Sequence, residues 1–187
     1  MDTKTALLDS AETIARQRGF DGFSYADLAT AVGIRKASIH HHFPTKAILG
    51  QAMMERYRLV FEDTLSELAK SRHAADGQLR GYIDIYRDAL QGGKTICLCV
   101  ALSSDRNSLD DATLREISHF HDASLKWLET LFETAQTDGS IKNLSERKLE
   151  AASCLALIEG AQLMAHASQD VTTFDNAVAL LLSRLTN

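Results

Sequence analysis

The chain has 187 residues, of which 45% are hydrophobic and 24% charged, and its formal net charge is −5. This composition is typical of a globular protein with a hydrophobic core, and it excludes disordered, collagen-like and mucin-like chains. The longest apolar run, residues 96–102, is far shorter than the roughly 20 residues of a membrane span, and the N-terminus lacks a signal-peptide pattern. We therefore expect a cytoplasmic protein that does not engage a membrane.

The distribution of charge indicates the kind of partner, and the number of cysteines indicates the redox compartment. Residues 1–50 carry six Lys/Arg against five Asp/Glu, whereas residues 51–187 carry fourteen against twenty. A neutral-to-basic first part on an acidic remainder indicates that only the first part meets a polyanion. Three cysteines are an odd number and indicate free thiols in a reducing compartment.

Helical segments dominate the sequence, because it contains one proline and its glycines fall mostly at segment boundaries. Residues 3–18 have the apolar spacing of an amphipathic helix. A capping-box pattern at Ser24 begins a second helix, which Gly33 ends. A third short helix over residues 35–43 must end before Pro44. We expect an all-α fold.

Six longer segments complete the predicted set of nine helices. Two more capping-box patterns, at Ser108 and Thr172, support two of the starts. We assign residues 1–50 to a helix-turn-helix DNA-binding domain and residues 51–187 to an effector-binding and dimerisation domain. The predicted helices after Pro44 cover residues 45–70, which join the two domains, and residues 76–91, 94–104, 109–138, 145–169 and 173–186.

The two short helices around Gly33 have the features of a helix-turn-helix. Small Ala29 lies four residues before the glycine and allows two helices to cross closely. Leu28 and Ile39 supply apolar contacts for that crossing. In such motifs the second helix enters the major groove of DNA. An ordinary helical hairpin is the alternative.

The run FSYADLATAVGIRKASIHHHFPTKAILGQAM, residues 23–53, resembles the TetR/AcrR-type transcriptional regulators. In that family one helix precedes the helix-turn-helix, and a fourth helix begins at a Pro/Ser/Thr-Lys step after His-Phe. The resemblance implies a homodimeric repressor that binds an inverted-repeat operator in double-stranded DNA. It also implies a helical C-terminal domain whose effector, a small molecule or a thiol-reactive electrophile or oxidant, releases the DNA.

The resemblance assigns DNA contacts residue by residue. At the start of the second helix it implies phosphate contacts, and on the third helix it implies an exposed recognition face. At the start of the fourth helix, a lysine would bind phosphate through its backbone amide and its ammonium. These contacts are Ser24, Tyr25, Arg35, Lys36, Ala37, Ser38, His40, His41 and Lys46.

The three consecutive histidines, His40, His41 and His42, do not have the spacing of a metal site. Neighbouring side chains on a helix point about 100° apart, so these three imidazoles cannot share one ion, and we expect no metal and no cofactor. We expect His42 to pack partly beside Phe43. His40 stands where the family usually has a tyrosine that bonds phosphate, so this contact is expected to be weaker or pH-sensitive.

Two thiols, Cys97 and Cys99, lie in the most apolar segment. They are either small buried hydrophobes or, for Cys97 near Lys94 and a helix start, a thiol sensor. The stretch Cys-Leu-x-x-x-Leu-Ser is similar to one in a subgroup of these regulators that respond to electrophiles or oxidants, which favours Cys97. Tyr57, Tyr86 and His166 are further candidates for an effector pocket.

Two apolar helix faces predict a dimer interface, although packing within one chain could use the same residues. A helical thiol enzyme with Cys97 as nucleophile and a protein-binding adaptor are alternative functions. We expect no enzyme, because the sequence contains no phosphate loop, paired-carboxylate site or metal-ligand set. The predicted interface residues are Ala151, Ala152, Ala156, Gly160, Ala161 and Met164 on one helix and Phe174, Val178, Leu181, Leu182 and Leu185 on the next.

Overall fold

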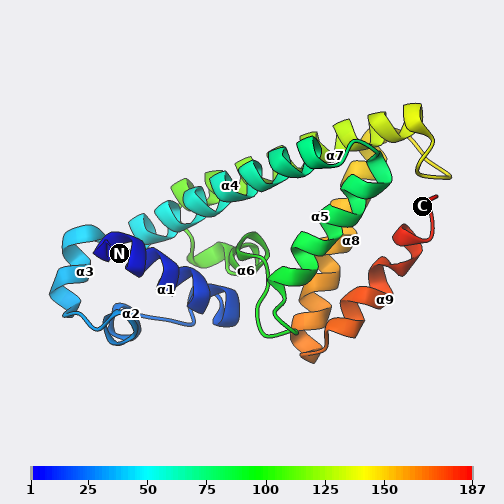
Figure 1. Cartoon of the computed structure of the whole chain (residues 1–187). Coiled ribbons are helices and arrows are strands. Elements are labelled where there is room, and N and C mark those ends of the chain that lie inside the picture. Colours follow the sequence, from blue (N-terminus) through cyan, green and yellow to red (C-terminus); the bar gives the residue numbers. More distant parts are fainter. Residues whose placement is uncertain (1, 187) are drawn as a thin grey trace. The chain divides into compact units, whose positions relative to one another are not determined.

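The computed structural model describes residues 2–186, and within them the chain is all-α, as predicted. Nine α-helices and one 3-10 helix account for the regular structure of these residues, which contain no β-strand (Figure 1). None of the described helices is both long and apolar enough to cross a bilayer. The elements are α1 (Thr3–Arg18), α2 (Tyr25–Val32), α3 (Lys36–His42), α4 (Lys46–Ser71), α5 (Ala75–Ala89), α6 (Leu98–Ser104), η1 (Arg106–Ser108), α7 (Asp111–Asp138), α8 (Arg147–Ser168) and α9 (Val171–Leu182).

The helices form two compact units. The first unit contains the described residues through Leu59 together with Leu98–Phe120, and the second contains Val60–Cys97 and the described residues from His121 onward. This structural division differs from the predicted one at residue 50, because α6 packs against α1 inside the first unit. The assignment of DNA binding and effector binding to residues 1–50 and 51–187 stays a prediction.

The start and end of α2 follow the predicted capping chemistry. The Ser24 hydroxyl accepts a hydrogen bond from the Ala26 amide, and the Asp27 carboxylate accepts one from the Ser24 amide at 2.7 Å. Gly33 then adopts a left-handed conformation with φ of 73°, which a residue with a Cβ atom rarely adopts. Local sequence therefore fixes both ends of this helix.

Two other predicted capping boxes are wrong. Ser108 lies in the 3-10 helix η1, so α7 is capped instead by Asp110, whose carboxylate accepts from the Thr113 amide at 3.1 Å. Likewise α9 is capped by Asp170, whose carboxylate accepts from the Thr172 amide at 2.9 Å. The capping aspartate follows the predicted cap residue Ser108 for α7 and precedes the predicted cap residue Thr172 for α9.

The predicted helix over residues 94–104 is shorter than expected, because α6 begins only at Leu98. Thr95 is held in a turn that closes α5: its amide donates to the Leu90 carbonyl at 3.1 Å and its hydroxyl to the Ala89 carbonyl at 2.7 Å. Cys97 consequently precedes α6 and does not lie in its first turn, which corrects the sequence-based placement.

An apolar core joins the helices of the first unit. Leu28 and Ile39, the predicted contacts of the helix-turn-helix, have no exposed surface. Phe43, which follows α3, is 1% exposed. α1 packs on α2, and α2 packs on α3. This arrangement leaves the opposite face of α3 in solvent.

The side chain of Lys46 anchors the loop between α1 and α2 to the start of α4. Its ammonium donates to the carbonyl oxygens of Phe20 and Phe23 at 2.5 and 2.6 Å. It also lies 4.5 and 4.3 Å from the centroids of the two phenyl rings, within the range of cation–π attraction. The Phe20 amide in turn donates to the Asp105 carboxylate at 2.5 Å. One ammonium thus positions the loop that leads into α2.

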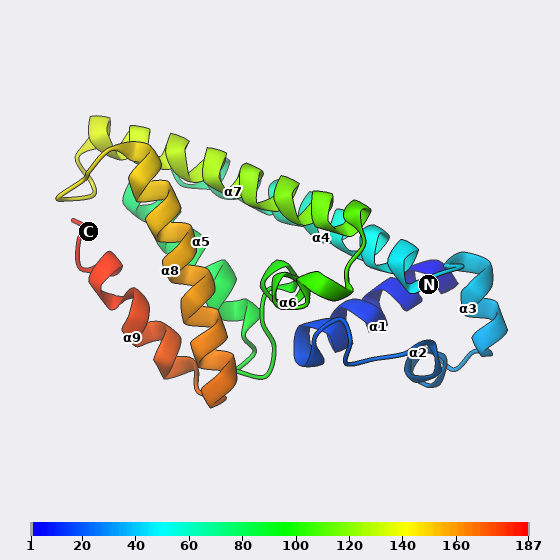
Figure 2. The ribbon, with the colours of Figure 1, turned by 180° about the vertical axis from the view of Figure 1, so that it is seen from behind.

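The second unit is built around α5, α8 and α9. α9 turns back along α8, and Figure 2 shows the two helices side by side. Arg184 closes the far end of this pair, since its guanidinium donates to both oxygens of the Glu150 carboxylate at 2.9 Å. Burial raises the pKa of Glu150, but the hydrogen bonds from Arg184 and from the Ser145 amide outweigh it and lower the pKa.

Replacing Lys46 with methionine is expected to destabilise the chain by about 2 kcal/mol, because two carbonyl oxygens lose a charged donor. The measurement is the free energy of unfolding from urea titrations. Lys36→Met is the matched control, since Lys36 is exposed and its loss should leave stability unchanged. Equal stability of Lys46→Met and wild type would show that the ammonium does not anchor the loop.

Candidate nucleic-acid interface

A hollow of about 430 Å³ in the first unit is lined by several of the predicted DNA-binding residues. The starts of α2 and α4 and one side of α3 converge on it. Since these three elements are separated in sequence by turns, only the fold brings their side chains together. Its lining residues are Phe23, Ser24, Tyr25, Lys36, His40, Pro44, Thr45 and Lys46.

The rest of the predicted contacts form the solvent face of α3. Ile39 faces the interior and has no exposed surface. The first turn of α3 contains no acidic residue. The outer face is therefore polar and cationic. The exposed residues of this face are Arg35, Lys36, Ala37, Ser38, His40 and His41, as the sequence predicted.

Two helix starts face the hollow, and they differ in charge. The first amides of a helix have no partner within the helix and carry partial positive charge, which favours a bound anion. At α2 the Asp27 carboxylate already occupies the cap, and hydrogen bonds from the Ser24 hydroxyl and amide lower its pKa. At α4 the cap is the neutral Thr45 hydroxyl, which accepts from the Ile48 amide at 3.2 Å. The start of α4 is thus the better anion site.

The hydroxyl of Tyr25 is bonded within the protein, while the predicted phosphate contact of this residue stays a prediction. The residue is 7% exposed, and its hydroxyl donates to the Phe43 carbonyl at 2.8 Å. Burial raises the pKa of Tyr25 to about 12, so the phenol stays neutral. A buried phenol requires such a partner. Tyr25 thus ties α2 to the end of α3.

Lys46 also has a structural role that the sequence did not predict. Two of the three N–H donors of its ammonium go to the Phe20 and Phe23 carbonyls, so at most one is left for a phosphate. Burial lowers the pKa of Lys46, against the charges of Asp21, Asp105 and Asp27, which raise it. Phosphate binding by the backbone amide of Lys46 at the start of α4 stays a prediction.

His40 is held at the rim of the hollow by two contacts. Its Nδ1 lies 3.2 Å from the Pro44 carbonyl oxygen, and its ring meets the Tyr25 ring edge-on with centroids 5.0 Å apart. The side chain is exposed. His42 is half-buried next to buried Phe43, in line with its expected packing.

The predicted effector residues are divided between the two units, and their role stays a prediction. Tyr57 and Cys99 belong to the first unit, whereas Tyr86, Cys97 and His166 belong to the second. All three thiols of the chain are buried. Burial raises the pKa of the Cys154 thiol to about 12.

Inside the second unit, Gln162 connects two of those candidates. Its amide oxygen accepts from the Cys97 amide at 3.0 Å, and its amide nitrogen donates to the Tyr86 carbonyl at 2.6 Å. Tyr86 is 1% exposed, and its hydroxyl accepts from that of Tyr82 at 3.3 Å. His166 lies with Nδ1 2.9 Å from the Gly93 carbonyl oxygen. Gln162, Tyr82 and Tyr86 are part of the core, whereas His166 is half-buried.

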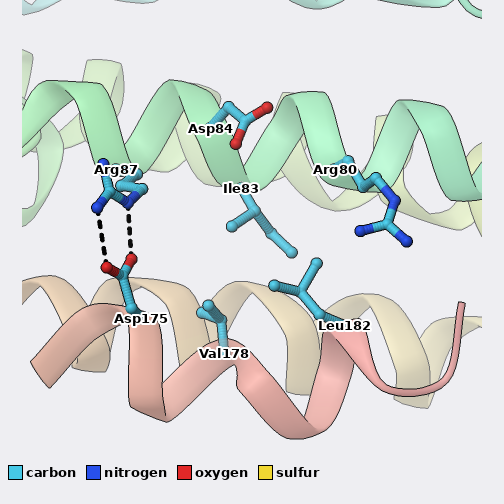
Figure 3. Close-up of a pocket in the computed structure, with 7 residues that line it drawn as sticks. All are labelled: Arg80, Ile83, Asp84, Arg87, Asp175, Val178 and Leu182. Atoms are coloured by element: carbon cyan, nitrogen blue, oxygen red, sulfur yellow. Dashed lines mark hydrogen bonds and ion pairs between the residues drawn. The ribbon is translucent and has the colours of Figure 1, made fainter. Parts of the chain in front are cut away.

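Two hollows in the second unit were not predicted from the sequence. The larger, of about 470 Å³, lies along α4, α5 and α7 and includes Lys126 and Trp127. The smaller, of about 300 Å³, lies between α5 and α9 (Figure 3). There Arg87 donates to both oxygens of Asp175 at 2.7 and 2.8 Å, a pairing without any local sequence signal.

An apolar face on α8 and α9 remains exposed. Some predicted interface residues, including Ala151, Ala161 and Phe174, are buried in the core of their own unit. Ala152 and Ala156 are exposed. Large apolar side chains join them on this face, and a groove of about 200 Å³ runs between the two helices. The exposed large residues are Leu149, Leu157, Leu163, Met164 and Leu180.

Comparison with known proteins places this geometry in a family. Residues 7–53 match the model for bacterial regulatory proteins of the tetR family. The transcriptional repressor NemR of Escherichia coli is 28% identical over 184 residues, which cover 95% of this chain and 91% of NemR.

Two solved structures extend the likeness to the whole fold. The reduced form of E. coli NemR superimposes with a TM-score of 0.85 at 26% identity and covers 100% of this chain and 98% of its own. A TetR-family regulator from Agrobacterium tumefaciens superimposes with a TM-score of 0.92 at 31% identity, over 98% of this chain and 97% of its own. The chain therefore belongs to the TetR family of bacterial transcriptional regulators.

Proposed function

We propose that the chain is a homodimeric repressor that binds an inverted-repeat DNA operator and is released from it by an effector. The observation that carries the proposal is the convergence of Lys36, His40 and the start of α4 on one hollow beside the exposed face of α3. Amides and cations at the hollow suit backbone phosphates, while the outer side chains of α3 suit base edges in the major groove.

The exposed apolar face of α8 and α9 supports the homodimer. Met164 and Leu180 are 59% and 79% exposed in the single chain, and large apolar patches on a surface mark interaction sites. Two copies related by a two-fold axis would cover each other's face, and the same symmetry would present two copies of α3 to an inverted repeat.

We propose the cleft at Trp127 as the effector site. Its volume of about 470 Å³ is in the range of small-molecule sites, and it combines an indole with the Lys126 ammonium, Gln78 and Thr130. The Trp127 indole N–H donates to the Leu65 carbonyl at 3.2 Å, which fixes the ring as one wall. An amphiphilic molecule that contains a ring would match this lining.

A thiol-reactive effector is a second candidate, because one solved relative is described by its redox state, the reduced form of NemR. Cys97 is the thiol we propose for it. The thiol-enzyme alternative is not proposed, since the family and the relatives that the chain matches are transcriptional regulators.

Lys36→Ala is expected to weaken binding to DNA from beside the protein's own gene about tenfold, because a cation at the hollow is lost. The measurement is a mobility shift at several salt concentrations. The control Lys142→Ala removes the same charge from an exposed position in the second unit and should bind as wild type does. If wild type binds no promoter fragment more tightly than random DNA, the repressor proposal is wrong and the adaptor alternative gains support.

Leu180→Glu should raise the dissociation constant of the dimer on the order of 100-fold, since each subunit would place a carboxylate in an apolar contact. Sedimentation velocity over a range of protein concentrations measures this change. Val60→Glu, at an exposed apolar residue of α4, is the control and should leave the dimer intact. An unchanged dimer in Leu180→Glu would place the interface elsewhere.

Cys97→Ser tests the thiol-reactive effector. Treatment with N-ethylmaleimide should release wild type and Cys154→Ser from DNA but leave Cys97→Ser bound, because the Cys154 thiol has a pKa of about 12 and is a poor nucleophile. The measurement is the fraction of bound DNA with time. Release of Cys97→Ser at the wild-type rate would leave a reversible small-molecule effector as the remaining candidate.

A further inference from the structure

We propose that His40 is an acid-dependent DNA ligand, which bonds a backbone phosphate through Nε2 only when its imidazole is doubly protonated. The inference rests on the proposed function and adds to it a regulation of the same surface by pH. It follows from the hydrogen bond that the ring makes within the protein and from the chemistry of the hollow beside it.

The Pro44 carbonyl fixes which nitrogen of His40 carries the hydrogen. Nδ1 lies 3.2 Å from this oxygen, and a carbonyl oxygen can only accept. The bond therefore requires the hydrogen on Nδ1. A neutral imidazole has a single N–H, so its Nε2 then has a lone pair and no hydrogen.

Protonation reverses what Nε2 can do. In the neutral ring, a lone pair on Nε2 would face the lone pairs of a phosphate oxygen, and no hydrogen bond could form. In the imidazolium, Nδ1 keeps its bond to Pro44 while Nε2 gains an N–H and the ring gains a positive charge. A charge-assisted hydrogen bond to phosphate then becomes available. DNA binding is thereby linked to proton uptake at His40.

Among the ionisable groups that line the hollow, His40 is the one expected to change charge near neutral pH. The others are Tyr25 from α2, Lys36 from α3 and Lys46 from α4. The Tyr25 hydroxyl is bonded to the Phe43 carbonyl, and its pKa of about 12 keeps it neutral. The lysines supply positive charge that favours the same anion. Histidine is the side chain that ordinarily changes charge between pH 5 and 8, and His40 is the one histidine lining the hollow.

The position of the ring makes the contact sterically possible. The side chain is exposed, so Nε2 can be reached from solvent, while the edge-on contact with the Tyr25 ring at 5.0 Å limits its rotation. A phosphate held by the amides at the start of α4 would lie in the hollow that His40 borders. The imidazolium would then complete a site formed by α2, α3 and α4.

The test measures operator affinity of the full-length protein at about pH 6 and about pH 8 by fluorescence anisotropy, for wild type and three variants. Wild type should bind more weakly at the higher pH, by up to about tenfold per pH unit for each subunit whose binding takes up one proton. Its salt dependence should be steeper at the lower pH, by about 0.9 in log–log slope for each additional phosphate contact.

The variants separate His40 from other titrating groups. His40→Gln should lose most of the pH dependence, because its amide does not titrate, and His40→Tyr, whose phenol donates at either pH, should bind tightly at both. His41→Gln, at the neighbouring exposed histidine of the same helix, should keep the wild-type pH dependence. Persistence of the pH dependence in His40→Gln, or equal wild-type affinity at both pH values, would overturn the inference while leaving the repressor proposal intact.

The tautomer of His40 can be measured directly in the protein without DNA. Nitrogen-15 chemical shifts of the His40 ring at high pH should show the tautomer with hydrogen on Nδ1. The Nε2–H tautomer would overturn the inference even if the variants fold poorly. Failure of wild type to bind any promoter fragment specifically at either pH would instead reject the proposed function, and this inference with it.

Discussion

The proposed DNA-binding surface depends on one half-buried contact, the Lys46 ammonium against the carbonyls of Phe20 and Phe23. A loop that leads into a short helix has few contacts of its own, and α2 has only 8 residues. By binding two carbonyls of that loop, a side chain from the start of α4 places the first residues of α2 beside the first residues of α4. The hollow exists because these two helix starts are held together.

The same contact explains why a lysine in a DNA-binding region need not act mainly on DNA. Removing an ammonium from water is unfavourable, and the lowered pKa of Lys46 reflects this burial. Two carbonyl acceptors and two aromatic rings offset that cost. Tyr25 follows the same rule, because its buried hydroxyl is satisfied by the Phe43 carbonyl. Both residues support the surface from beneath, while Lys36 and His40 remain on it.

In the second unit, two of the residues that the sequence suggests as effector contacts, Tyr86 and Cys97, are buried, and other residues line the hollows that a ligand could enter. Tyr86 and Cys97 lie on either side of Gln162, which satisfies a backbone group of each. The hollows instead expose residues such as Trp127 and Lys126, which come from the middle of a long helix. The chemical reactivity of a residue type therefore does not predict whether a ligand can reach that residue, because packing decides which side chains line a cavity.

Features that depend on near neighbours in the chain could be predicted from the sequence: the helices of the described residues, the capping box at Ser24, the left-handed turn at Gly33 and the exposed face of α3. These follow from backbone conformation and helical periodicity, which act over a few residues. Only the tertiary structure decided the partners of Tyr25 and Lys46 and the Arg87–Asp175 pair, since hydrogen bonds between distant residues leave no local pattern. The hydrogen bond of His40 is an intermediate case. Pro44 follows only four positions later in the chain, but the turn after α3 is needed to bring its carbonyl to the imidazole ring.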